Sequence, residues 1–306
     1  MNCILNTFVI MCVIIYIYIK LINIFYYMLF PLQQPDTSSF SDKEKSAFRN
    51  ISYSKQNLYY RKAKEQGFRA RSVYKLKEIH SNFNILSSSP KYLDLCAAPG
   101  SWSQMLRLLT KSIPNSKIVS VDIQDIVPIE GVDIIKGDIT SQSTIEEILK
   151  CFNNEKVDVV IFDGAPDVTG LIDIDMYMQV DLIIFALVIC MKLLKKNGKF
   201  VAKIFKVDVK ETNEMLTSST YAVKSDFYYE KVKVLFDNVY YYKPASSRSS
   251  SHESFLVCEG FGIDNEEIEN EITKMSMNDL FNFETNVTNT AVKDFLRFLI
   301  KGGYTL

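Results

Sequence analysis

The sequence lacks the usual signatures of metal and disulfide chemistry. Its 306 residues contain two histidines and no C-x-x-C pair, and the six cysteines are scattered along the chain. They are Cys3, Cys12, Cys96, Cys151, Cys190 and Cys258. This spacing argues against a zinc site or a disulfide framework, so we expect no metal and a reducing compartment. Neither G-x-G-x-x-G nor G-x-x-x-x-G-K-[ST] occurs, so the sequence lacks the glycines that a dinucleotide site or a phosphate-binding P-loop requires.

An overall excess of charge is also missing, but the charge is unevenly distributed. The net charge is −1, yet residues 43–77 contain eleven Lys/Arg and two acids, and residues 264–294 contain eight acids and two lysines. A basic segment before a neutral domain favours a polyanionic partner, and a solvated basic helix explains the charge alone equally well. With 47% hydrophobic and 23% charged residues, the composition is that of a globular protein with an ample core.

Residues 1–32 are apolar almost throughout, with Lys20 as their only charge. They are long enough to span a bilayer but lack the basic start and the cleavage site of a signal peptide. A charge in the middle of a span costs roughly 3 kcal/mol, and Met28 is an alternative translation start. We interpret 1–32 as a dispensable hydrophobic extension and expect a cytoplasmic protein, with a membrane anchor over residues 4–30 as the alternative. Residues 33–55 are interpreted as a linker.

The rest of the chain alternates between strand and helix patterns. Short apolar runs predict seven strands, over residues 92–96, 117–123, 132–138, 157–163, 199–205, 237–242 and 253–260. Helices are expected at 101–110, 143–152, 174–194 and 228–236, the third of them ending in a Lys-Lys-Asn-Gly stop at 195–198. This order predicts an α/β fold, with a mostly parallel sheet and helices on both faces. The acidic, weakly periodic extension at 263–306 is expected to form an appended helix or a partly disordered tail.

The stretch KYLDLCAAPGSWSQML at 91–106 predicts a strand, a tight turn and a helix, which is a common ligand position in such sheets. Gly100 and its small neighbours permit close approach, although a connection without a ligand would have the same sequence. Asp122, Asp138 and Asp163 each end a strand, and Asp122 follows Gly100 at the spacing of a ribose-binding acid. Each aspartate could instead cap a helix. Together they indicate a nucleoside ligand with a positive charge, such as a sulfonium.

Seven stretches, in this order, resemble the FtsJ/RrmJ-type RNA 2′-O-ribose methyltransferases, and most closely the eukaryotic branch that modifies the tRNA anticodon loop. They are YYRKAKEQGFRARSVYKLKEI, YLDLCAAPGSWSQML, VSVDIQ, IKGDIT, FDGAPDVTGLIDID, FVAKIF and KPASSRSSSHESFLVCEGFG. The resemblance covers 56–262. It implies a Rossmann-like S-adenosylmethionine-dependent methyltransferase fold with a seven-stranded sheet. DGAPDVTG is typical of the tRNA enzymes in this family.

The resemblance also implies roles for individual residues. S-adenosyl-L-methionine is the expected cofactor, and its expected ligands are Gly100, Trp102, Asp122, Asp138 and Asp163. The family's catalytic tetrad corresponds to Lys75, Asp163, Lys203 and Glu253, with Lys203 assisting deprotonation of the ribose 2′-hydroxyl. Without the resemblance, Lys75 would be interpreted as a solvated helix lysine and Lys203 as a strand-end lysine that extends to solvent. The expected partners are tRNA and, as a further possibility, an auxiliary protein subunit.

Several alternatives stay open. The tetrad is shared by enzymes that methylate rRNA or mRNA caps, and a catalytically silent RNA-binding subunit would have the same fold. This chain also departs from the family in one loop, because Lys206 and Val207 stand where a glycine is common after KIF[KR]. The segment from Lys206 to Tyr229 is longer than usual, which affects the loop expected to face RNA.

Overall fold

The computed structural model describes residues 58–86, 91–166, 172–205, 231–248, 251, 253–263 and 265–301. All of them belong to the unit from Ser52 to Leu306. The hydrophobic extension at 1–32, and with it the membrane anchor predicted over 4–30, lies outside the described residues, as does the linker at 33–55. Within the described ranges, no helix has both the length and the apolar character needed to cross a bilayer.

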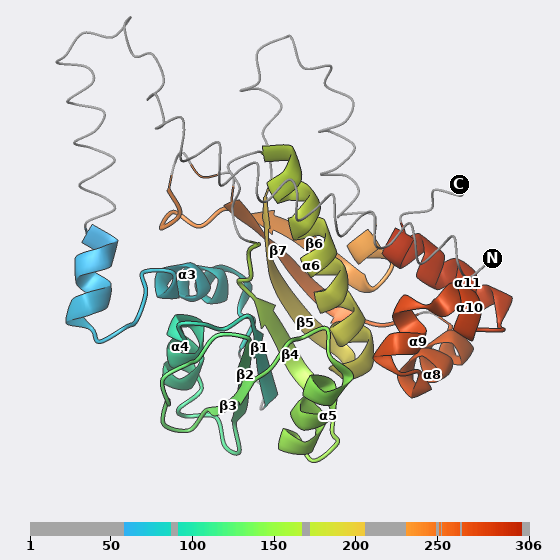
Figure 1. Cartoon of the computed structure of the whole chain (residues 1–306). Coiled ribbons are helices and arrows are strands. Elements are labelled where there is room, and N and C mark those ends of the chain that lie inside the picture. The colour runs from blue at the N-terminus through green and yellow to red at the C-terminus, as the bar shows by residue number, and fades with distance from the viewer. Residues whose placement is uncertain are drawn as a thin grey trace, which may run out of the picture. The chain divides into compact units, whose positions relative to one another are not determined.

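A seven-stranded sheet in the order β3-β2-β1-β4-β5-β7-β6 organises the structure (Figure 1). Strands β1 to β5 pair in parallel, and β7 runs antiparallel to both β5 and β6. The strands are β1 (Lys91–Leu95), β2 (Lys117–Asp122), β3 (Asp133–Lys136), β4 (Val157–Phe162), β5 (Leu194–Phe205), β6 (Phe236–Tyr242) and β7 (Glu253–Phe261). All seven strands were predicted from their short apolar runs, and the mostly parallel α/β fold is confirmed.

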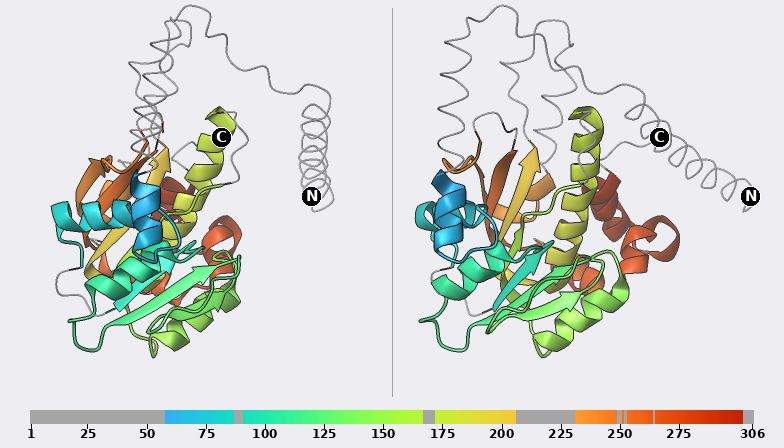
Figure 2. Two further views of the ribbon diagram at one scale, coloured as in Figure 1. Left: turned by 90° about the vertical axis from the view of Figure 1, so that its left-hand side faces the viewer. Right: turned by 60° about the vertical axis from the view of Figure 1, so that its left-hand side comes forward.

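Helices cover both faces of the sheet (Figure 2). Residues 58–65 are helical, followed by α3 (Val73–Phe83) and α4 (Ser101–Leu109), and α3 and α4 pack on one face through Val73, Leu76 and Met105. On the other face lie α5 (Gln142–Cys151) and α6 (Ile172–Leu193). Side chains alternate along each strand, so that Val159 and Ile161 of β4 point toward α3 and α4, and Val160 and Phe162 point toward α6.

The link between α6 and β5 differs from the prediction. Residues 195–198 were expected to end the helix and precede the strand, but the structure places them inside β5, which begins at Leu194. They form an irregular start of the strand, because the β4–β5 register shifts between Val157 and Val159 and Asn197 has a left-handed φ of 62°. The turn residues are therefore used for a bulge rather than for a separate loop. In the segment expected to be helical at 228–236, residues 231–233 are helical and β6 begins at Phe236, while 228–230 lie outside the described residues.

The acidic segment after residue 262 is folded through residue 301. It contains α8 (Glu266–Lys274), α9 (Met277–Phe281), α10 (Phe283–Asn286), α11 (Thr290–Leu296) and a π-helical turn (Arg297–Lys301). Their apolar residues, among them Ile272, Leu280 and Leu296, join the core on the α6 side. Lys192 donates to the carbonyl of Thr273 at 2.6 Å, and Lys231 donates to that of Leu299 at 2.6 Å. Burial lowers the pKa of each lysine to about 8.

Candidate active site

The expected cofactor turn lies where β1 leads into α4. Gly100 has a φ of 99°, and a Cβ atom there would lie 2.7 Å from the Arg69 guanidinium, so the position requires glycine. The Arg69 guanidinium donates to the carbonyls of Pro99 at 2.9 Å and Pro128 at 3.0 Å. Its backbone N–H donates to Gln104 Oε1 at 2.9 Å. Arg69 therefore fastens this turn to the loop that follows β2.

Two of the predicted cofactor aspartates bind nearby backbone. Asp122 is buried at the end of β2 and accepts from the N–H of Ala98 and that of Gln124, both at 2.8 Å. Asp138 is exposed beyond β3, and its Oδ1 accepts from the N–H and the hydroxyl of Thr140, both at 2.8 Å. Asp122 thereby links the ends of β1 and β2. Asp138 forms a local turn just before α5. It lies at the carboxyl-terminal edge of the parallel strands β1 to β4, which is called the crevice below.

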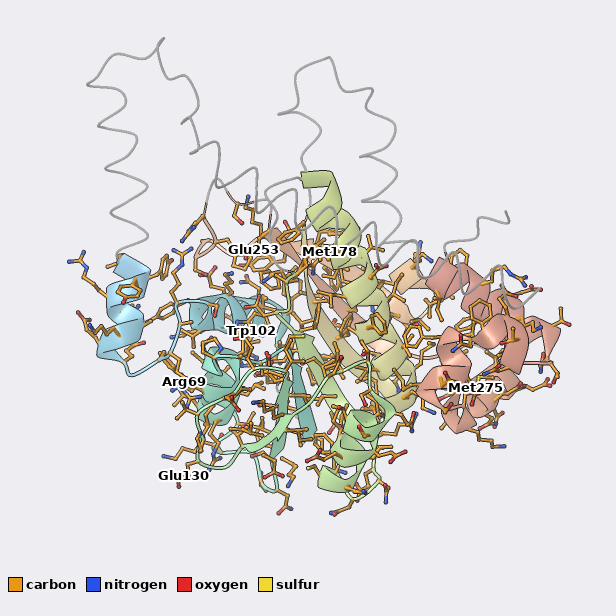
Figure 3. All side chains as sticks on the ribbon, viewed as in Figure 1. Arg69, Trp102, Glu130, Met178, Glu253 and Met275 are labelled. Carbon is orange, nitrogen blue, oxygen red and sulfur yellow. The ribbon has the colours of Figure 1, made fainter. Side chains whose placement is uncertain are left out.

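Trp102 lies in the middle of the structure (Figure 3), and its side chain is packed into the hydrophobic core. It is 2% exposed, its indole N–H donates to the Ser72 carbonyl at 3.0 Å, and its ring lies 5.6 Å from that of Phe255. A ligand at the crevice can therefore meet Trp102 only through its backbone, at the start of α4, where helix N–H groups lack intrahelical partners. The side chain itself anchors α4 against the segment that precedes α3.

Asp94 belongs to the same crevice but was not predicted from the sequence. It lies in β1, is 1% exposed, and accepts from Ser103 Oγ at 2.6 Å, while its Oδ1 has no hydrogen-bond partner among the described residues. Burial raises its pKa to about 7, and the charges of Asp163 and Asp122 act in the same direction. Three carboxylates at adjacent strand ends favour a cationic ligand there. Asp94 is the first residue of the DLCAAPG stretch, and its position just before the predicted turn could have identified it from the sequence.

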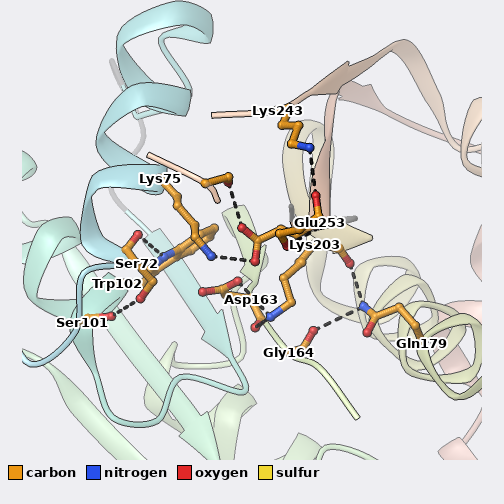
Figure 4. A network of polar contacts seen from close by, with 12 residues as sticks. Ser72, Lys75, Ser101, Trp102, Asp163, Gly164, Gln179, Lys203, Lys243 and Glu253 are labelled. Carbon is orange, nitrogen blue, oxygen red and sulfur yellow. Dashed lines mark hydrogen bonds and ion pairs between the residues drawn. The ribbon is translucent and has the colours of Figure 1, made fainter. Parts of the chain in front are cut away.

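The four residues of the predicted tetrad come together as two ion pairs (Figure 4). Lys75 of α3 contacts Glu253 Oε2 at 2.7 Å. The Lys203 ammonium lies 3.3 Å from Asp163 Oδ1 and donates to the Asp163 carbonyl at 2.9 Å. All four side chains are 10–17% exposed. Both pairs are therefore mostly buried, but each keeps a small contact with solvent.

The alternation of the strands explains this meeting. Ile161 of β4 and Val201 of β5 belong to the core below α3, so Asp163 and Lys203, two positions further along each strand, lie on the same face. Because β7 is antiparallel, its first residue, Glu253, pairs with Phe205 at the edge where β4 and β5 end. Lys75 of α3 completes the group from above this face.

The surroundings of Glu253 and Asp163 shift the pKa values of these two carboxyl groups in opposite directions. Burial acts to raise the pKa of Glu253, but the charge and hydrogen bond of Lys75 and the hydrogen bond of Ser247 outweigh it, so the pKa lies below its ordinary value. For Asp163, burial outweighs the attraction of Lys203 and Lys75, and the pKa is raised. The site thus combines Glu253, whose ionised form is stabilised, with Asp163, whose carboxylate is more basic.

The loop between β6 and β7 is fixed to α3 beside this site. Glu78 accepts from the backbone N–H of Ala245 at 2.6 Å and that of Ser246 at 3.1 Å. Ser247 donates to Glu253 Oε1 at 2.8 Å. At the rim, the pKa of Arg71 is lowered by burial and by the nearby charge of Arg248. The loop therefore brings a second arginine to the mouth of the site.

The structure describes one of the two histidines. Burial and the charge of Lys199 lower the pKa of His80, which lies on α3. His252 is outside the described residues. Among the residues that the structure describes, no group of three or more His, Cys, Asp or Glu side chains could hold a metal ion.

A mostly parallel seven-stranded sheet with acids and lysine–carboxylate pairs at its strand ends defines a Rossmann-like methyltransferase. Residues 68–261 match the family described as FtsJ-like methyltransferase, and the chain belongs to this family. A tRNA (cytidine(32)/guanosine(34)-2′-O)-methyltransferase of Schizosaccharomyces pombe is 45% identical over 216 residues, which cover 68% of this chain and 70% of that protein. A ribosomal RNA large subunit methyltransferase E of Methanothrix thermoacetophila is 40% identical over 65% of this chain and 70% of its own.

A solved structure supports the same fold. The crystal structure of a Plasmodium falciparum protein described as a ribosomal RNA methyltransferase superposes with a TM-score of 0.52 at 24% identity. The match covers 63% of this chain and 98% of the other. At this identity the likeness speaks for the shared fold alone.

Proposed function

We propose that this protein uses S-adenosyl-L-methionine to methylate a ribose 2′-hydroxyl in the anticodon loop of tRNA. The observation that carries the proposal is the meeting of Lys75, Asp163, Lys203 and Glu253 at one edge of the sheet. The relative from Schizosaccharomyces pombe is named for this reaction at positions 32 and 34. The DGAPDVTG stretch and the basic segment ahead of the domain support the same substrate.

The residues of the crevice fit the proposed cofactor. Asp94 has one buried carboxylate oxygen without a hydrogen-bond partner in the described part of the chain, and the neighbouring Asp122 is held in place by two backbone N–H groups. Gly100 and Asp138 line the same edge, with the backbone of Trp102 at the start of α4. When bound, S-adenosylmethionine supplies an activated methyl group on a sulfonium. An acidic crevice suits that positive charge.

Methylation of a 2′-oxygen would form an O–CH₃ bond while the S–CH₃ bond of the sulfonium breaks and a neutral thioether leaves, and it requires the hydroxyl proton to leave. We assign the centre of this step to Lys203, whose ammonium is held by the carboxylate and carbonyl of Asp163. A lysine at this position acts either as the base that takes the proton or as the cation that stabilises the developing alkoxide. Both benefits arise in the transition state rather than in the bound ground state.

The second pair is assigned an orienting role. Lys75 and Glu253 are joined at 2.7 Å, and Ser247 donates to the other oxygen of Glu253, so the carboxylate is fixed from two sides. A fixed carboxylate and ammonium next to Lys203 position the ribose and its neighbouring groups for reaction. A catalytically silent RNA-binding subunit would not need both pairs.

The decisive test is transfer of a labelled methyl group to bulk tRNA, followed by nuclease mapping of the modified nucleotide. We expect a 2′-O-methyl group within the anticodon loop. An rRNA transcript is the comparison substrate, because the relative from Methanothrix thermoacetophila is named for rRNA. Methylation of rRNA in preference to tRNA, or no transfer to either, would overturn the proposal. If transfer to tRNA is absent with the pure protein but is restored by added cell extract, the proposal stands and an auxiliary subunit is required.

A further inference from the structure

Gln179 of α6 reaches the reaction site from the face of the sheet opposite to the catalytic side chains. Its side chain is completely buried. The Nε2 amide donates to the carbonyl of Lys203 at 2.7 Å and to that of Gly164 at 3.3 Å (Figure 4). Because the side chains of Asp163 and Lys203 point the other way, these backbone carbonyls are what α6 can hold.

The two carbonyls lie where regular pairing between β4 and β5 has ended. The last paired residues of the two strands are Phe162 and Ala202. Lys203 comes immediately after this pair on one strand, and Gly164 comes two residues after it on the other. The amide of Gln179 therefore bridges the two chains at the point where the sheet opens into the crevice.

The chemistry of the side chain suits this bridge. A carboxamide NH₂ group has two N–H bonds, one for each carbonyl, and no other neutral side chain of this length donates two hydrogen bonds from one atom. The Oε1 atom of Gln179 has no hydrogen-bond partner within the described residues, which is unfavourable for a buried oxygen. An apolar residue would avoid that penalty but would leave both carbonyls without this donor, so the two donated bonds explain the glutamine.

We propose that Gln179 is a positioning residue for methyl transfer. It holds the backbone of Lys203 against that of Gly164 and so fixes the separation between the Lys203 ammonium and the Asp163 carboxylate. The inference rests on the roles proposed above for Lys203 and Asp163. Small displacements of reacting groups are costly, since a shift of about 1 Å lowers rates by roughly a hundredfold.

The first test replaces Gln179 by methionine, which is similar in length and removes both donors. We expect the single-turnover rate of tRNA methylation to fall by roughly ten- to a hundredfold. The KM for tRNA and the affinity for S-adenosylmethionine should change less than about threefold, because ground-state binding does not depend on the bridge. Gln142→Met is the matched control: Gln142 joins α5 to the N–H of Met277 at 2.8 Å, on an exposed surface, and its loss should leave the rate unchanged.

The second test is Gln179→Glu. A buried glutamate is protonated at low pH and then donates one hydrogen bond, but once ionised it repels both carbonyls. We expect this variant to be most active, relative to wild type at the same pH, at the acidic end of the range and to lose activity as pH rises. Gln179→Met should show no such relative pH dependence. If Gln179→Met does not fold, the relative pH profile of Gln179→Glu tests the proposed positioning role by itself.

Lys203→Ala, assayed in parallel, separates this inference from the proposed function. If Lys203→Ala loses activity and Gln179→Met keeps the wild-type rate, Gln179 has no positioning role and the proposed function stands. If Lys203→Ala keeps its activity, the role proposed for Lys203 fails first, and the positioning role of Gln179 fails with it. A loss in the Gln179 variants that is confined to KM or to thermal stability, with a flat relative pH profile, also overturns the inference.

Discussion

Lys75 and Glu253 lie 178 residues apart in the sequence and form an ion pair of 2.7 Å beneath the loop between β6 and β7. The pair joins α3 to the first residue of the antiparallel strand β7. Both side chains are nearly buried, so each compensates the charge of the other. This pairing ties the stability of the domain to the geometry of the proposed reaction site.

We expect Lys75→Met to destabilise the fold by about 3 kcal/mol, because it leaves the Glu253 carboxylate buried without its cation. Lys75→Met/Glu253→Gln should recover part of that loss, which denaturant unfolding of the two single variants and the double variant measures. The pair also predicts a pH dependence. The pKa of Glu253 is lowered in the fold, so its stabilisation is present above the unfolded value near 4.5 and is lost as pH falls through the folded value. Equal stability of wild type and Lys75→Met at neutral pH would contradict this.

Lys203→Ala should lower the single-turnover rate by roughly a hundredfold or more, the scale for a positioned acid–base or oxyanion group. Binding of tRNA and of S-adenosylmethionine should change little, because the interaction is strongest in the transition state. Lys199→Ala is the matched control, since Lys199 lies on the same strand and pairs with Glu259 at 2.7 Å away from the site. Similar rates for the two variants would remove Lys203 from the reaction.

Asp122→Ala should weaken binding of S-adenosylmethionine by about 1–3 kcal/mol, because two backbone N–H groups lose their acceptor at the expected cofactor turn. Isothermal titration calorimetry measures the change. Asp125→Ala is the control, since Asp125 is exposed and contacts only Lys136 among the described residues. Unchanged affinity in a folded Asp122→Ala protein would separate this aspartate from the cofactor site.

The two arginines ahead of α3 should behave differently. Arg71→Gln should weaken tRNA binding and reduce the dependence of log affinity on log salt by about one, as expected for the loss of one phosphate contact. Arg69 belongs to the same basic segment, but its guanidinium binds the carbonyls of Pro99 and Pro128. Arg69→Gln should therefore weaken the binding of S-adenosylmethionine in addition to that of tRNA. Cofactor affinity equal to wild type in Arg69→Gln would contradict the structural role.

Asp94 predicts a second dependence on pH. Its pKa is raised from 3.8 to about 7, so the fold retains a proton that the unfolded chain has lost between these values. Stability should therefore fall as pH rises from about 4 to about 7, by up to roughly 4 kcal/mol from this group. Asp94→Asn should flatten that part of the curve in denaturant titrations, whereas Asp125→Asn, at an exposed position, should follow wild type. Parallel curves for wild type and Asp94→Asn would exclude the shift.

The sequence by itself determined the strands, and its resemblance to the methyltransferase family predicted the residues of the proposed reaction site. The central strands β1, β2 and β4 are short apolar runs because they are buried on both faces of the sheet. The C-terminal helices were predicted only as an appended helix or a partly disordered tail, because their periodicity is weak and acidic. Their capping residues were nevertheless readable: Asn265 and Asn289 accept from the N–H groups that follow them, and Ser276 forms a capping box with Asp279.

Only the tertiary structure decided how the site residues face one another. Whether a side chain points to the crevice depends on which neighbour occupies the other face, and that neighbour is distant in the sequence. Trp102 turns inward because Ser72 and Phe255 receive it, and Arg69 turns to the cofactor turn because two carbonyls lie within reach. Gln179 could be given a role only once α6 was seen to lie against the opened ends of β4 and β5, since hydrogen bonds to backbone carbonyls leave no pattern in the residues that provide them.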